Sequence, residues 1–388
     1  MRGRFARTLE AAMNRRQFLA ASMALPAFVR GASTRVALAR CPVYSALVYD
    51  TLNTMFDQLG GLAGLVSNKF VTIKVNFTGP PEMRLNGAPI GSAQWVHWGV
   101  IGCLLDLLGS AGARRILLCE SAGDTSGPLE AFVARAGWDP SYFLNAAPNV
   151  KMVNTNLAGD YGRYSRFTVP YGGYLFPGFD LSPAYEECDV FISLTKLKQH
   201  LMAGITLSMK NVFGTLPLTI YGTNAGIDEP GNDTSGFRGE VMHIGQRAPS
   251  MSAPQEVNPV SPRNAGYRLP RVITDLNAAR PIHLAIIDGI ETMAGGEGPW
   301  TTGLSLVRPG VLIAGLNPVS TDAVGTAVMG FDPMAAGGAS TFRNTDNMLD
   351  FAETVGLGTR DLNNIEVIGE RIQDVVCPFG PLGPPTAM

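Results

Sequence analysis

The chain has 388 residues, of which 46% are hydrophobic and 16% are charged, and its formal net charge is −2. This composition excludes an intrinsically disordered chain and a membrane-embedded one. Residues 1–34 hold six of the 30 Lys and Arg residues but only one of the 32 Asp and Glu residues. The rest of the chain is therefore acidic, which excludes general nucleic-acid binding because that function needs a basic face.

The first 33 residues have the layout of an export signal. The sequence Arg15-Arg16-Gln17-Phe18-Leu19 matches the twin-arginine pattern, and an apolar run follows it to about Val29. We predict a twin-arginine signal peptide over 1–33, transport by the twin-arginine translocase, and a periplasmic or extracellular location. The alternative is a basic amphipathic helix of the mature protein. No later apolar run approaches the roughly 18–20 residues of a membrane span.

Strand and helix patterns alternate along residues 35–136. The predicted strands are 35–40, 70–77 and 115–120, and the predicted helices are 44–59, 95–108 and 129–136. This alternation predicts a parallel sheet with right-handed crossovers. The five cysteines form no C-x-x-C pair, so the sequence contains no zinc-knuckle or iron–sulfur cluster motif.

The pattern is less regular in the middle of the chain. Short strands are predicted at 150–153, 167–169 and 174–176, as a small β-rich excursion that forms a subdomain over 140–180 in one interpretation. A buried strand follows at 189–194. Residues 215–268 are rich in Gly, Pro, Asn and Ser, which predicts a long loop or lid.

Regular patterns return toward the carboxyl terminus, with predicted helices at 269–279 and 320–329 and predicted strands at 283–288 and 311–315. Residues 34–388 are therefore interpreted as a single α/β domain with a mostly parallel sheet and helices on both faces.

Chemically active side chains follow the strand at 189–194, where ligands of open α/β sheets gather. Three of the chain's six Lys residues lie within fifteen residues here, and Lys74 lies toward the end of another predicted strand. A lysine offers a compact charge, a tunable pKa and a nucleophile. The predicted catalytic residues are His200, Lys198 and Lys210. A solvated basic strand end and a structural His are the alternatives.

Further polar side chains surround these three in the sequence. The predicted substrate-binding residues, which favour a small anionic molecule, are Lys74, Asn76, Lys196, Thr206, Asn211 and His243. Four carboxylates at predicted strand ends or in the following loops are candidate metal ligands: Glu120, Asp288, Glu297 and Asp322. Helix caps and loop salt bridges are the alternatives for these carboxylates.

The central motifs resemble a known family. The sequence reads K-L-K-x-H at 196–200, G-x-T at 204–206 and K-N-x-x-G at 210–214. These motifs resemble the signature of the domain-of-unknown-function family 362 (DUF362). Weaker blocks match in the same order across about residues 34–360: Lys74-Val75-Asn76-Phe77, Glu120-Ser121, His243, Asp288-Gly289-Ile290, Gly298-Pro299, Asn317-Pro318 and Asp322. The sequence departs from the family's usual Asp-Pro-Val-Ala at Asn317 and Ser320, and the acidic residue of the glycine loop, Glu297, lies one position from its usual place.

A second resemblance concerns His200 and Lys210. A His, a glycine-containing stretch and a Lys ten residues after the His resemble the nickel-pincer lactate racemase family. That resemblance implies that His200 is an acid/base and that Lys210 holds the cofactor. It makes a divalent metal or a nickel-containing cofactor the expected cofactor class.

Two functions remain open at this point. The first is an exported, metal- or cofactor-dependent enzyme that acts on a small carboxylate-type anion by racemase- or epimerase-like proton transfer. The second is a non-catalytic anion- or metal-binding protein, or an accessory subunit exported together with a redox partner. A serine or cysteine hydrolase is disfavoured, because no nucleophile-elbow motif is present.

Overall fold

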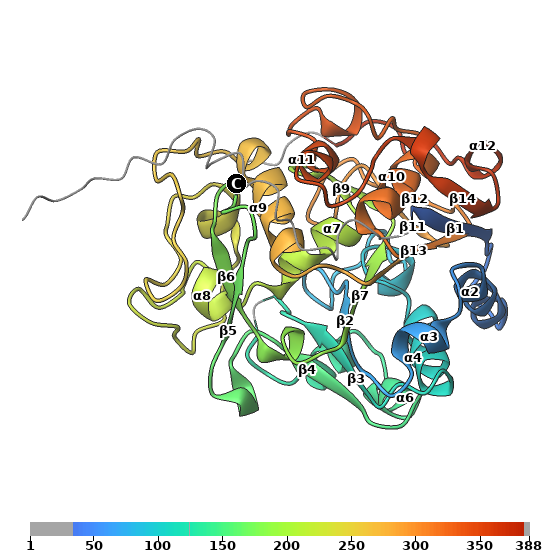
Figure 1. Cartoon of the computed structure of the whole chain (residues 1–388), viewed down its shortest axis with the longest axis horizontal. Helices are drawn as coiled ribbons and strands as arrows, with labels where there is room; N and C mark the ends of the chain where they lie inside the picture. The colour runs from blue at the N-terminus through green and yellow to red at the C-terminus, as the bar shows by residue number, and fades with distance from the viewer. Residues whose placement is uncertain (1–33, 124, 384–388) are drawn as a thin grey trace, which may run out of the picture.

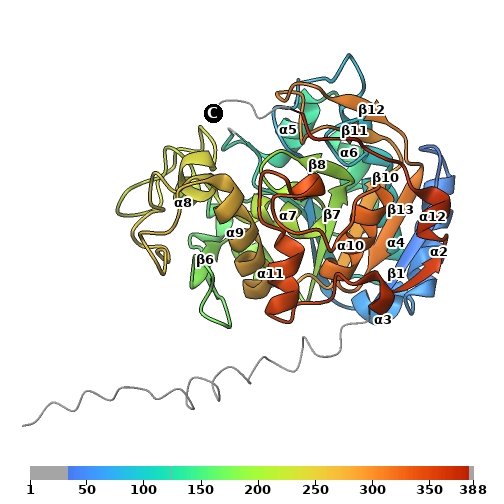
Figure 2. The same ribbon diagram turned by 90° about the horizontal axis from the view of Figure 1, so that it is seen from above.

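A computed structural model describes residues 34–123 and 125–383, so the predicted signal at 1–33 lies outside the described residues. An eight-stranded sheet crosses the molecule (Figures 1 and 2). In spatial order its strands are β14 (Glu366–Gly369), β1 (Arg35–Arg40), β13 (Val311–Gly315), β10 (Leu284–Gly289), β7 (Val190–Lys196), β2 (Phe70–Val75), β3 (Arg115–Glu120) and β4 (Val150–Asn154). Only β13 runs against its neighbours β1 and β10, which confirms the predicted mostly parallel α/β sheet.

Both faces of the sheet are covered, because alternate residues of each strand enter one of two apolar cores. One core contains α2 (Leu47–Gln58), α4 (Trp98–Ser110), α5 (Leu129–Arg135) and α6 (Pro140–Leu144). The other contains α7 (Ser208–Asn211), α9 (Ala265–Ala279), α10 (Pro318–Val328) and α11 (Met348–Thr354). We call these the α4 face and the α7 face. The short helices α3 (Leu62–Val66), α8 (Leu218–Tyr221) and α12 (Ile372–Val375) complete the set of described α-helices.

Three two-stranded sheets lie outside the main one. They pair β5 (Ser165–Thr168) with β6 (Gly178–Leu181), β8 (Lys198–His200) with β9 (Gly204–Thr206), and β11 (Thr292–Ala294) with β12 (Ser305–Val307). The prediction of a strand at 174–176 is wrong. The backbone N–H groups of Tyr174, Leu175 and Phe176 donate to the buried Asp275 carboxylate instead of to a neighbouring strand.

Residues 215–268 contain α8 and a π-helical turn at Gly239–His243, and the rest of this segment is irregular. In both views α8 lies beside β6 (Figures 1 and 2). Within the described ranges, no helix combines the length and the apolar character needed to traverse a bilayer. All five cysteines are free thiols.

Candidate functional site

The carboxyl ends of β2 and β7 lie side by side where the order of the strands reverses. The chain runs from β2 outward to β3 and β4, and then returns to the other side of β2 to form β7. Ligands of open α/β sheets bind at such a switch point. Lys74 of β2 lies opposite Ser193 of β7 in the register, and Lys74 points to the α7 face. Lys196 is three residues after Ser193 in β7, so it points to the α4 face. The sheet therefore separates these two lysines.

Lys196 is part of an internal ion pair. Its Nζ lies 2.9 Å from Asp288 Oδ2 and donates to Gly91 O (2.6 Å) and to the Tyr44 hydroxyl (2.8 Å), and both charged side chains are fully buried. Asp288 also accepts from the N–H of His97 at the start of α4. Lys196 was predicted to bind substrate and Asp288 to bind metal, but the structure gives each an internal partner that joins β7 and β10 to the α4 face.

Lys74 pairs with Glu120 on the α7 side of the switch point. Lys74 Nζ lies 2.8 Å from Glu120 Oε1, both side chains are buried, and Nζ also donates to Asn211 Oδ1 (3.1 Å). Burial lowers the pKa of Lys74, and the nearby Glu120 opposes that shift. A Cβ atom on Gly214 would lie 2.7 Å from Lys74 Nζ and 2.8 Å from Glu120 Oε1, which explains the glycine that ends the K-N-x-x-G motif.

Asn211 bridges the two strands of the switch point. Its Nδ2 donates to Lys74 O (2.9 Å) and to Ser193 Oγ (3.0 Å), and its Oδ1 accepts from Asn76 Nδ2 (3.3 Å). Asn76 Oδ1 is buried and has no hydrogen-bond partner within the described ranges. Asn211 therefore holds β2 and β7 together at the site, and the Oδ1 atom of Asn76 is a hydrogen-bond acceptor beside it that no described residue uses.

The guanidinium of Arg238 joins the site from the irregular segment 215–268. It donates from Nε to Leu216 O (2.6 Å) and from its NH2 to Ser121 O (2.9 Å) and to Ser121 Oγ. Burial lowers its own pKa to about 10, and its charge lowers the pKa values of Lys74 and Lys210. Sequence reasoning missed this residue because no motif distinguishes it from the chain's other Arg residues.

Lys198 and His200 lie on β8 beside Glu297. Lys198 Nζ donates to the carbonyls of Gln94 (2.7 Å) and Glu297 (3.0 Å), but no carboxylate of the described chain pairs with it, and burial lowers its pKa well below the ordinary value. Burial also lowers the pKa of His200, so the imidazole is neutral at pH 7. His200 Nδ1 accepts from the Met202 N–H (3.2 Å), which leaves the proton of the neutral ring on Nε2. Glu297 Oε2 lies 3.7 Å from Nδ1, too far for a hydrogen bond.

Lys210 and His243 are the least satisfied groups of the site. Lys210 Nζ lies 4.3 Å from the centre of the Phe213 ring and makes no hydrogen bond to the residues that the structure describes. Burial lowers the pKa of Lys210 to about 7. His243 packs on the same ring, at 5.2 Å between centroids, and both of its ring nitrogens are buried without a partner in the described chain.

These groups lie close enough to shift one another's pKa values. We call them the basic cluster: Lys74, Glu120, Lys198, His200, Lys210, Arg238, His243 and Glu297. The cluster contains four Lys or Arg side chains but two carboxylates, and its imidazoles are neutral. Burial lowers the pKa values of Lys198 and Lys210, and an anion beside these amines would favour their charged forms, so the cluster favours an anionic ligand.

Asp322 positions the helix that carries Lys210. It reaches from α10 to accept from the N–H groups of Ser208 and Met209, both at 2.8 Å, at the start of α7. Burial raises the pKa of Asp322 to about 7, and these two bonds oppose the shift. Thr206 lies opposite Lys198 in the β8–β9 pair, and its buried hydroxyl has no partner among the described residues.

We expect Asp322→Asn to destabilise the protein although the two side chains have the same shape. The Asn amide group cannot accept from the second N–H of α7, so one buried donor is left unpaired, at a cost of about 1–3 kcal/mol. The free energy of unfolding in urea measures this loss. Asp332→Asn is the matched control, because that exposed carboxylate accepts from one local N–H. Equal effects in the two variants would contradict the role given to Asp322.

The four carboxylates predicted as metal ligands do not come together. Glu120 and Asp288 pair with different lysines, Asp322 caps α7, and Glu297 accepts from the Leu201 N–H (3.0 Å). Within the described chain, no three His, Cys, Asp or Glu side chains form a group suited to a metal ion. Because the basic cluster also repels cations, its residues do not fit a divalent metal. A nickel-containing organic cofactor stays a prediction.

Comparison with known proteins agrees with the motifs found in the sequence. No curated protein matches the chain. The family model described as Domain of unknown function (DUF362) matches residues 71–327, which include every residue of the basic cluster. Because this match covers well over half of the chain, the protein belongs to the DUF362 family.

Proposed function

We propose that this protein is an enzyme that binds a small carboxylate-type anion at the basic cluster and transfers a proton at the carbon next to that carboxylate. The observation that carries the proposal is the unpartnered Lys210 amine within a site that has more cations than carboxylates. An amine with a pKa of about 7 is present in both protonation states at neutral pH, as a general base and its conjugate acid require.

The other groups have separate roles in this proposal. Lys198 and Arg238 attract the carboxylate and stabilise the negative charge that develops on it when the carbon loses its proton. His200 is neutral and carries its proton on Nε2, so it donates a hydrogen bond to the same oxygens instead of accepting the proton. Lys210 Nζ takes the proton from carbon and returns it, which gives racemisation or epimerisation when the return is to the opposite face.

The second candidate is a non-catalytic anion-binding protein or an accessory subunit that accompanies a redox partner. The same excess of cations supports this function, because it favours an anion whether or not chemistry follows. The two candidates differ only at Lys210 and His243, whose unpartnered nitrogens an anion carrier does not need.

Proton exchange with solvent distinguishes the two candidates. We expect the protein to incorporate deuterium from D₂O next to the carboxylate in at least one member of a panel of 2-hydroxy and 2-amino acids, as followed by NMR. Isothermal titration calorimetry with the same panel measures binding. Arg238→Met should weaken binding by about tenfold or more, since charge-assisted hydrogen bonds contribute about 1.5–3 kcal/mol. Binding without exchange across the panel would favour the carrier, and absence of binding would refute both.

We also propose export by the twin-arginine translocase, based on Arg15-Arg16 and the apolar run that follows. Replacing both arginines with lysine should retain the protein in the cytoplasm of its host, because the translocase reads the arginine pair and not its charge alone. Fractionation followed by immunoblotting measures the distribution. Arg2→Lys with Arg4→Lys is the matched control, and equal retention of both double variants would contradict the proposal.

A further inference from the structure

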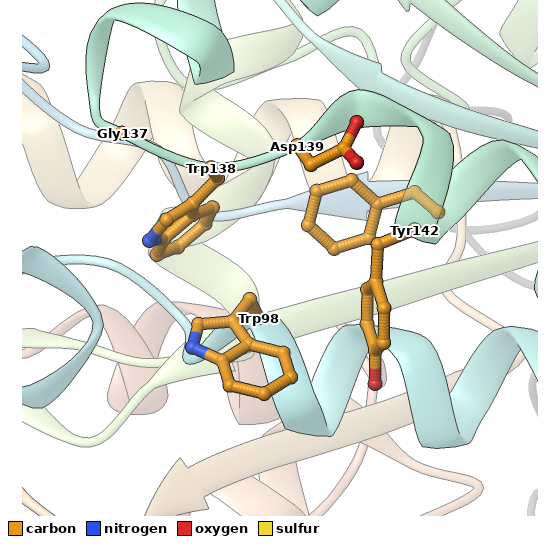
Figure 3. A pocket seen from close by; sticks show the side chains of 6 residues that line it. Trp98, Gly137, Trp138, Asp139 and Tyr142 are labelled. Carbon is orange, nitrogen blue, oxygen red and sulfur yellow. The ribbon is translucent and has the colours of Figure 1, made fainter.

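A hollow lined by aromatic side chains lies on the α4 face. Its volume is about 240 Å³, and the residues that line it are Trp98, Gly137, Trp138, Asp139, Tyr142 and Phe143. Figure 3 shows the rings of Trp98, Trp138 and Tyr142 around a common space, with the Asp139 carboxylate at its rim. None of these residues belongs to the basic cluster, so the hollow is a separate feature of the molecule.

The rings are held in place but remain accessible. Trp98 is 42% exposed and Tyr142 is 44% exposed, and their rings meet edge to face with centroids 5.1 Å apart. Trp138 meets the buried Phe143 in a similar way, at 6.2 Å. Several aromatic rings gathered at one exposed hollow are unusual for a surface that serves no binding function.

Neighbouring residues shape the hollow. A Cβ atom on Gly102 of α4 would lie 2.4 Å from Cε1 of Tyr142, so only glycine lets that ring lie against the helix. Asp139 accepts from the Ser141 N–H (2.9 Å), which fixes the carboxylate at the rim. The hydrogen bonds of Ser141 lower the pKa of Asp139, so this group is an anion at neutral pH.

Charges of both signs lie near the hollow: Arg84 donates to Ala136 O (2.9 Å), next to Gly137, and the Asp139 carboxylate lies at the rim. Asp106 lies close enough to Tyr142 to help raise the pKa of its hydroxyl, after burial and Cys103. His97 packs beside Trp98 with centroids 5.0 Å apart, but burial lowers its pKa to about 4, so it brings no positive charge at pH 7. Within the hollow itself, a cation meets aromatic rings and the Asp139 carboxylate, the one charged group among the lining residues.

We propose that this hollow binds an organic cation of the methylated ammonium type. The face of an aromatic ring is electron-rich and attracts a cation within about 6 Å, and the methyl groups of such a cation pack on the rings without losing strong hydrogen bonds to water. The carboxylate at the rim supplies a counter-charge. The basic cluster repels cations, so it does not compete for this ligand.

Isothermal titration calorimetry with choline and with its neutral tert-butyl isostere, 3,3-dimethylbutanol, tests the assignment. We expect choline to bind and the isostere to bind at least about fivefold more weakly, because only choline gains the cation–π attraction. Trp98→Ala should weaken choline binding by about tenfold. Phe237→Ala is the matched control, because that side chain is 62% exposed outside the hollow and its loss should change nothing.

A second variant separates charge from packing. Asp139→Asn alters an exposed carboxylate without removing a ring, so it should weaken choline binding and leave the weak binding of the isostere unchanged. Equal binding of choline and its isostere would overturn the proposal in favour of a purely apolar hollow. Binding of glucose in place of choline would overturn it in favour of a sugar site, and absence of choline binding to the intact protein would refute it directly.

Discussion

Replacing Lys210 with Met is expected to lower the rate of deuterium exchange next to the substrate carboxylate by about 10²–10⁴-fold, the usual contribution of a general base. Methionine has a similar length and keeps the contact with the Phe213 ring, which Lys210 Nζ approaches to 4.3 Å. The amine makes no hydrogen bond to the described residues, so its removal leaves no buried group unpaired. The variant should therefore fold normally and retain binding of the anion.

The pH dependence provides an independent check on Lys210. If the amine is the base, the exchange rate of the wild-type protein should rise with pH and level off above about 7, the pKa of Lys210. The stability should change in the same direction. The folded protein holds this proton less tightly than the unfolded chain, whose lysine pKa is near the ordinary value of 10.5, so the free energy of unfolding rises as pH increases from about 7 to 10.5.

Lys151→Met is the control for these measurements, because Lys151 is exposed and lies outside the basic cluster. It should leave both the exchange rate and its pH profile unchanged. A Lys210→Met protein that exchanges at the wild-type rate would rule out Lys210 as the base. A pH profile that stayed flat between 6 and 8 in the wild type would contradict the same role.

Much of the sheet could be predicted from the sequence because most of its central strands are buried on both faces. Such strands read as unbroken apolar runs, and the strands predicted at 35–40, 115–120 and 311–315 match β1, β3 and β13 to the residue. The short hairpin β8–β9 carries polar side chains and has no such run. The position of this hairpin is set by contacts with Glu297 and Phe342, which lie far away in the sequence.

The composition of the site could be predicted only in part, because a sequence does not reveal the register between strands. Lys74, Lys196 and Lys198 all lie at or just after the ends of predicted strands, yet the register that places Lys74 opposite Ser193 sends Lys196 to the other face of the sheet. If β7 were shifted by one residue against β2, every side chain of β7 would turn to the opposite face of the sheet, and Lys196 would lie on the same face as Lys74. The same limit explains why Asp288, which lies opposite Lys196 in the register, was grouped with carboxylates from the other face of the sheet.

The structure divides the family's central motifs into two kinds of residue. In K-L-K-x-H, the first lysine stabilises the fold through Asp288, whereas Lys198 and His200 belong to the basic cluster. In K-N-x-x-G, Asn211 bridges the strands and the glycine makes room for Lys74, whereas Lys210 is left unpartnered. Substitutions within one motif should therefore affect either stability or function, according to the side chain that is changed.

The strongest expected effect on stability follows from that division. Lys196→Met leaves the fully buried Asp288 without its counter-ion, and breaking a buried pair in this way costs about 3–5 kcal/mol of the free energy of unfolding, measured in urea. The double variant Lys196→Met with Asp288→Asn removes both charges but keeps an acceptor for the His97 N–H, so its free energy of unfolding should fall less than that of the single variant.

Arg371→Met is the control: it breaks an exposed pair with Asp374 and should change stability little. A double variant less stable than the single one would show that the pair itself, and not the unpaired charge, determines the loss. Anion binding in the folded double variant should equal that of the wild type, because the sheet separates this pair from the basic cluster.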